Sequence, residues 1–78
     1  MKTAKEMFEE LGYKCIADTN YDIIFQKGNQ YTSDGIKIDF DLDLDAIKIE
    51  FLMDKCRWFS FEELQAINKM VSELGWNE

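Results

Sequence analysis

Alternating acidic side chains form the part of this sequence best suited to chemistry. Four aspartates recur at every second position and a glutamate follows them: Asp39, Asp41, Asp43, Asp45 and Glu50. Their spacing matches ligand positions of a helix-flanked calcium loop, in which carboxylate oxygens bind the ion at about 2.3–2.6 Å. Leu44, however, stands where that loop needs a glycine for its sharp turn. Calcium binding through residues 39–45 is therefore kept as an alternative function.

Residues that usually carry catalysis or hold a cofactor are scarce. The chain has no histidine, which removes the commonest general base and the commonest metal ligand. No GxSxG motif surrounds a serine, and no phosphate-binding glycine loop occurs. Cys15 and Cys56 do not form a CxxC pair, so we expect buried, reduced thiols. We predict that the protein is not an enzyme and has no catalytic residue, cofactor or metal ligand.

The charge of the chain is strongly acidic. Its 78 residues carry a net charge of −7, and residues 34–50 hold six acids against two lysines. This sign argues against direct binding to nucleic acid. A rigid row of carboxylates can instead imitate the phosphates of DNA or RNA and occupy the basic cleft of a host protein. An acidic mimic is therefore the second alternative, and it would bind through Asp39, Asp41, Asp43 and Asp45. The same run is also typical of a solvated strand face.

Period-2 alternation predicts that these aspartates lie on strands. Apolar and charged residues alternate over residues 36–45 and again over residues 47–54. This pattern indicates an antiparallel hairpin with one buried face and one wet face. We predict a loop at residues 43–46, with Asp41 directly opposite Lys48 and an apolar residue opposite every apolar residue.

Two helices bracket the strands. Thr3 with Glu6, and Ser60 with Glu63, form the capping boxes that begin helices, and a glycine ends each helix. Each helix carries one apolar stripe, formed by Ala4, Met7, Phe8 and Leu11 in the first and by Leu64, Ile67, Val71 and Leu74 in the second.

Further strand candidates complete the predicted order. Residues 13–17 and 21–27 lie between the first helix and the hairpin, and residues 56–59 are a shorter candidate before the second helix. The chain is therefore predicted to form one α+β domain over residues 1–78, in the order α-β-β-β-β-α. A twisted antiparallel sheet would carry two helices packed on one face.

Aromatic residues gather where the second helix is predicted to begin. Trp58, Phe59 and Phe61 lie within this short stretch, and an extended chain cannot bury both of its faces. One of Trp58 and Phe59 is therefore a candidate for an exposed interface anchor, and we name Trp58 as the partner-binding candidate. The interpretation that we favour has the helix cover the aromatic residues and bury them.

The two ends of the chain carry a resemblance. TAKEMFEELGY (residues 3–13) and FEELQAINKMVSELGW (residues 61–76) resemble a group of small uncharacterised proteins encoded by bacteriophages and prophages of Gram-positive bacteria (Firmicutes). The resemblance implies a phage accessory protein in the bacterial cytoplasm. It brings no activity, ligand or functional residue with it.

These observations favour a non-catalytic protein–protein interaction module whose partner is an unknown host or phage protein. No apolar run follows the N-terminus as a secretory signal requires, and none approaches the ~20 residues of a membrane span. We therefore expect a cytoplasmic protein of the bacterial host that contacts no membrane. A homodimer, formed through a free sheet edge, is left open.

Overall fold

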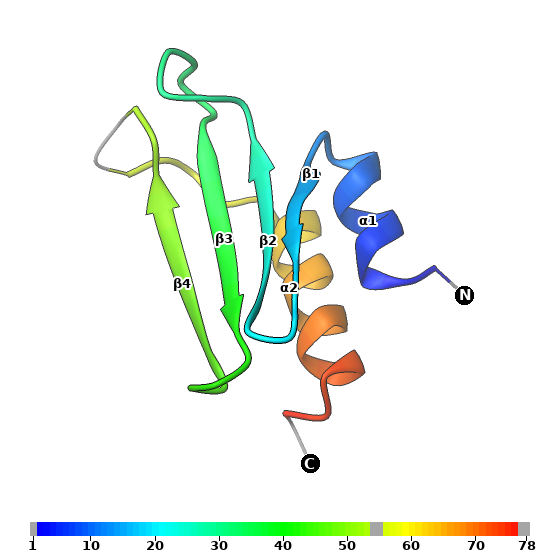
Figure 1. Ribbon diagram of the computed structural model, residues 1–78. Coiled ribbons are helices and arrows are strands. Elements are labelled where there is room, and N and C mark those ends of the chain that lie inside the picture. The colour runs from blue at the N-terminus through cyan, green and yellow to red at the C-terminus, as the bar shows by residue number, and fades with distance from the viewer. Residues whose placement is uncertain (1, 54–55, 77–78) are drawn as a thin grey trace.

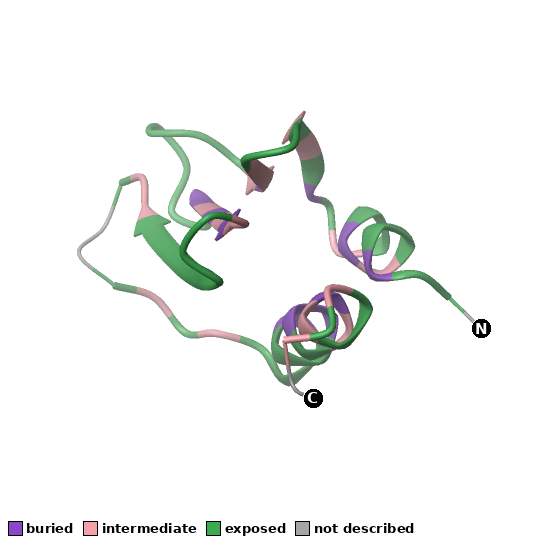
Figure 2. Ribbon diagram, turned by 60° about the horizontal axis from the view of Figure 1, so that its bottom comes forward, coloured by how far each residue is buried: buried purple, intermediate pink, exposed green. Residues whose placement is uncertain are grey.

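A computed structural model describes residues 2–53 and 56–76 of the chain. The elements are, in order, α1 (Ala4–Glu10), β1 (Lys14–Asp18), β2 (Asp22–Lys27), β3 (Ile36–Asp41), β4 (Ala46–Phe51) and α2 (Phe61–Glu73). The strands form one antiparallel sheet in the order β1-β2-β3-β4 (Figure 1). Both helices lie on the same side of this sheet (Figure 2). The predicted α+β fold and its order of elements are confirmed.

Phenylalanine side chains join the first helix to the sheet. Phe8, Phe25 and Phe40 are fully buried, and the rings of Phe8 and Phe25 stack with centroids 4.3 Å apart. After α1, Gly12 adopts a φ of 93° and turns the chain so that Tyr13 packs edge-on against Phe8 at 5.2 Å. Such a contact is typical of a helix that ends at a left-handed glycine.

α1 and α2 pack against each other, and the start of α1 is bonded to the end of α2. Ala66 of α2 is fully buried. The backbone N–H of Ala4 donates to Oε2 of Glu73 at 2.8 Å, so the start of α1 is bonded to the last residue of α2. Neither α1 nor α2 is long and apolar enough to cross a membrane.

The buried face of α2 differs from the predicted apolar stripe at two positions, Glu63 and Leu64. Leu64 is 46% exposed, whereas Glu63, Ala66 and Ile67 are buried. Ile67, Val71 and Leu74 of the predicted stripe do face the core, and Glu63 is held inward by hydrogen bonds described below. Residues 56–59 form no strand, which corrects that expectation, and the Cys56 thiol is exposed rather than buried.

The β3–β4 hairpin has the predicted phase but a different register. Asp39, and not Asp41, lies opposite Lys48, so the pairing is shifted by two residues. A shift of two keeps every side chain on its predicted face, which is why the alternation alone does not distinguish the two registers. The inner face therefore carries Ile38 opposite Ile49, as an apolar pair.

Candidate functional site

A buried ion pair fixes the segment that leads from β4 to α2. Arg57 donates from Nη1 to Oε1 of Glu63 at 3.1 Å and from Nη2 to Oε2 at 2.6 Å. The hydroxyl of Tyr13 also donates to Oε2, and the backbone N–H of Ser60 donates to Oε1 at 2.9 Å. Glu63 is only 3% exposed, and both of its carboxylate oxygens accept hydrogen bonds. We refer to Tyr13, Arg57 and Glu63 as the anchoring cluster.

The anchoring cluster has fixed charges at neutral pH. Burial alone raises the pKa of Glu63, but hydrogen bonds from Arg57, Tyr13 and the backbone of Ser60 outweigh burial and bring this pKa down to about 2. Burial and the bond to Glu63 raise the pKa of Tyr13, and the bond to Glu63 raises the pKa of Arg57. None of the three groups exchanges a proton near neutral pH, so the cluster positions the chain rather than performing acid–base chemistry.

Trp58 extends into solvent because its neighbours are held inward. Arg57 and Phe59 are half-buried, and the guanidinium of Arg57 lies 5.8 Å from the centre of the Phe59 ring. Nη1 of Arg57 also donates to the carbonyl oxygen of Trp58 at 2.7 Å. In this extended segment the side chain between two inward residues points outward, and Trp58 is 96% exposed. The expectation that α2 covers Trp58 is therefore wrong.

The aspartates do not form the predicted row. Oδ1 of Asp41 accepts hydrogen bonds from the backbone N–H groups of Asp43 and Leu44, each at 3.0 Å, and these bonds end β3 at Asp41. Residues 42–45 form the turn, in which Asp45 has a φ of 50°. The loop predicted at residues 43–46 thus begins one residue earlier. Asp43 and Asp45 lie in this turn, so only Asp39 and Asp41 share the outer face of β3.

The outer face of β3 and β4 is a lattice of opposite charges. Lys37 lies opposite Glu50, and Asp39 lies opposite Lys48. We refer to these four residues as the charge ladder. Burial, followed by the nearby charges of Asp22 and Asp41, raises the pKa of Asp39, and its Oδ1 is buried without a hydrogen-bond partner. Within residues 2–53 and 56–76, no three side chains of metal-ligating type come together around a common point.

The inner face of β4 extends beyond the helices. Ile47 and Ile49 are 36% and 42% exposed, although Phe40 and Ile38, which lie opposite them on β3, are fully buried. Figure 2 shows the reason: α1 and α2 lie toward the β1 and β2 side, and β4 lies at the far side of the sheet. The expectation that the inner face is covered throughout by the helices is corrected here.

The backbone of β4 is also open along one side. The N–H of Leu52 donates to the carbonyl oxygen of Gly35 at 3.0 Å, which continues the β3–β4 pairing. In an antiparallel strand, alternate residues direct both backbone groups to opposite sides. The backbone groups of Ile47, Ile49 and Phe51 therefore point away from β3, and no other strand of the described chain pairs with them. We refer to these three residues as the β4 strip.

The opposite edge of the sheet is irregular. The β1–β2 register shifts between Cys15 and Ala17, which marks a bulge, and α1 contacts β1. A bulge and a covering helix are two devices by which proteins protect edge strands. β4 pairs with β3 without a register shift over its whole length.

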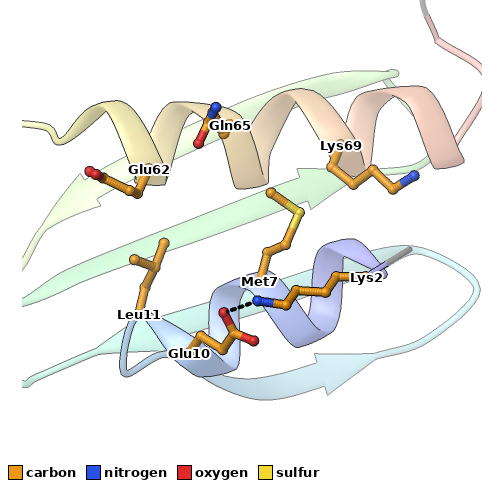
Figure 3. A pocket seen from close by; sticks show the side chains of 7 residues that line it. All are labelled: Lys2, Met7, Glu10, Leu11, Glu62, Gln65 and Lys69. Atoms are coloured by element: carbon orange, nitrogen blue, oxygen red, sulfur yellow. Dashed lines mark hydrogen bonds and ion pairs between the residues drawn. The ribbon is translucent and has the colours of Figure 1, made fainter.

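A hollow lies in the seam between the two helices (Figure 3). It has a volume of about 410 Å³, and Met7 and Leu11 of α1 form its apolar part. Lys2 and Glu10 form an exposed ion pair at 2.7 Å on its rim. None of the polar side chains that line the seam is buried, so no fixed polar group orients a ligand there.

Comparison with known proteins identifies no relative. The chain matches no protein-family model, no curated protein and no solved structure. Of the predicted partner-binding residues, Trp58 is exposed, and Asp39 and Asp41 share one strand face. Ile47, Ile49 and Phe51 of the β4 strip were predicted to be buried in the core.

Proposed function

We propose that the chain is a non-catalytic protein-binding module that binds through the β4 strip. The observation that carries this proposal is the coincidence of two open features on one strand. The backbone groups of Ile47, Ile49 and Phe51 face the free edge, and the side chains of Ile47 and Ile49 are only partly covered. An added strand would satisfy the backbone groups, and its apolar side chains would cover the isoleucines.

Trp58 supports the same proposal as a second contact point. Its indole is almost completely exposed, while the chain on either side of it is held by the anchoring cluster. A tryptophan on a rigid backbone loses little freedom on binding, and tryptophan is enriched among the residues that dominate protein interfaces. An open hollow of about 600 Å³ lies beside it, lined by Ser33, Cys56 and Arg57.

The acidic mimic receives less support. Asp39 lies opposite Lys48, which offsets its charge, and Asp43 and Asp45 lie in a turn rather than on the strand. Such a mimic depends on carboxylates, whereas the proposed module depends on apolar side chains. The two functions therefore respond differently to salt and to substitution.

Affinity capture in cells tests the proposal. A tagged and an untagged form of the chain are expressed together, so that capture of a second copy is detected as well as capture of another protein. The host is a Gram-positive bacterium, because the two ends of the chain resemble phage proteins of such hosts. Capture is compared at low and high salt. We expect protein capture that tolerates salt, that Ile49→Lys abolishes, and that Ile16→Lys leaves unchanged. Ile16 is a matched control, since it is an exposed isoleucine on β1.

Two results would contradict the proposal. Capture that survives Ile49→Lys would show that the β4 strip is not the contact surface. Capture that disappears at high salt, and that is lost when Asp39, Asp41 and Asp43 are replaced together by asparagine, would favour the acidic mimic instead.

A further inference from the structure

We infer that the partner of the β4 strip is a second copy of this chain, paired antiparallel through β4 around a two-fold axis at Ile49. The inference rests on the proposed function and names its partner. It follows from three properties of β4: the direction of its free backbone groups, the order of its charges, and the identity of its inner side chains.

The backbone determines which residues can pair. Two antiparallel edge strands bond when outward-facing residues of one lie opposite outward-facing residues of the other. On β4 these are Ile47, Ile49 and Phe51. A two-fold axis at Ile49 places it opposite Ile49 of the second copy and places Ile47 opposite Phe51 of the second copy. Every outward N–H and C=O group of the strip then has a partner.

The charges on the outer face select this register. With the axis at Ile49, Lys48 lies opposite Glu50 of the second copy, and the symmetry makes this pair twice. Moving the second copy by two residues in one direction places Lys48 opposite Lys48 of the second copy. Moving it by two residues in the other direction places Glu50 opposite Glu50 of the second copy. Like charges directly opposite each other destabilise a strand pair, so both alternatives are disfavoured.

The charge ladder continues across the proposed junction. Within one chain, Lys37 lies opposite Glu50, and Asp39 lies opposite Lys48. In the dimer, a row across the outer face therefore reads Lys37, Glu50, then Lys48 and Asp39 of the second copy. The signs alternate at every step along both such rows. An edge lysine normally deters strand addition, but here it meets a carboxylate in one register.

The inner face gains cover in the same arrangement. Ile49 meets Ile49 of the second copy, and Ile47 meets Phe51, so the partly exposed side chains form cross-strand apolar pairs. The assembly also closes at two chains. The remaining outer edge is β1, where the bulge between Cys15 and Ala17 and the neighbouring α1 hinder further pairing.

Charge exchange between two variants tests the register. Sedimentation equilibrium of the wild-type chain is expected to show a mass that rises with concentration from 9.2 kDa toward twice that value. Lys48→Glu and Glu50→Lys are each expected to weaken dimerisation at least about tenfold, because each puts like charges opposite each other twice. An equimolar mixture of the two variants should dimerise again, since every junction pair then joins opposite charges.

Matched controls separate this effect from net charge. Lys14→Glu and Glu62→Lys make the same charge changes at exposed positions outside β4, and both should dimerise like the wild type. A wild-type chain that stays at 9.2 kDa up to millimolar concentration overturns the inference. A wild type that dimerises alongside a mixture that stays monomeric overturns it too, provided that circular dichroism shows both variants folded.

Hydrogen exchange of the wild-type chain tests the inference without any variant. The amides of Ile47, Ile49 and Phe51 should gain protection as concentration rises, whereas the amide of Leu52, already bonded to Gly35, should not. Unchanged exchange at the three amides refutes the pairing. If the isolated chain is monomeric but Ile49→Lys still abolishes capture of another protein in cells, this inference fails and the proposed function stands. If Ile49→Lys changes neither dimerisation of the isolated chain nor capture in cells, both this inference and the proposed function fail.

Discussion

Replacing Glu63 by glutamine tests the anchoring cluster. The substitution keeps the shape of the side chain and removes the charge that Arg57 and Tyr13 contact. The fall in the pKa of Glu63 from its ordinary value of 4.5 to about 2 corresponds to about 3 kcal/mol between its two charge states. Part of this is recovered because the Arg57 side chain is 14% exposed and gains hydration. We expect Glu63→Gln to lower the free energy of unfolding by about 2–3 kcal/mol at neutral pH.

The pH dependence of this loss has a defined sign. The pKa of Glu63 is lower in the folded chain than in the unfolded chain, so its stabilisation is complete above pH 4.5 and disappears as the pH falls through about 2. Urea denaturation of wild type and variant across this window should therefore give curves that converge toward low pH. Glu62→Gln, at an exposed position in the same turn of α2, serves as the control and should change stability little. A difference between wild type and Glu63→Gln that stays constant across the window refutes the reasoning.

Three further predictions concern stability and are read out by thermal or urea denaturation. Gly35→Ala should lower the free energy of unfolding by about 2 kcal/mol or more, since its Cβ would lie 2.2 Å from the carbonyl oxygen of Asn29; a neutral effect would mean that this loop yields easily. Trp58→Ala should change it by less than about 0.5 kcal/mol, because the indole is exposed, and a large loss would mean that Trp58 packs against the core. Asp22→Asn should raise the free energy of unfolding by about 0.2–1 kcal/mol at low salt, because Asp22 lies directly opposite Asp41 and the two carboxylates repel each other. This gain should shrink at high salt. Destabilisation at low salt would mean that the repulsion is negligible.

Local patterns predicted the elements and their phase. The capping boxes at Thr3 and Ser60 are present as expected, and so are the left-handed glycines that follow each helix. These features depend on residues within a few positions of one another, so the sequence shows them directly. The register of β3 with β4 was not predictable in this way, because a shift of two preserves the alternation. It is decided by Asp41, whose side chain bonds to the turn.

The candidate surface depended on contacts between distant residues. Which of Trp58 and Phe59 turns inward is decided by the bond from Arg57 to Glu63 and by Tyr13, which lies fifty residues from Glu63. A local signal would be a contrast in hydropathy, but Trp58 and Phe59 are both aromatic. The exposure of Ile49 carried no such signal, since its alternation with Lys48 and Glu50 is the same as that of a covered strand. It follows from where the helices lie, which only the assembled fold determines.

The bond between Ala4 and Glu73 has a consequence for synthesis of the chain. α1 spans seven residues, too few for a helix to persist by itself in water. Its first turn is held by the last residue of α2, and Tyr13, just after it, by the first turn of α2. During synthesis α1 leaves the ribosome before α2, so these two bonds cannot form until α2 has emerged from the exit tunnel. The attachment of α1 and Tyr13 to α2 is therefore a late step in the formation of this domain.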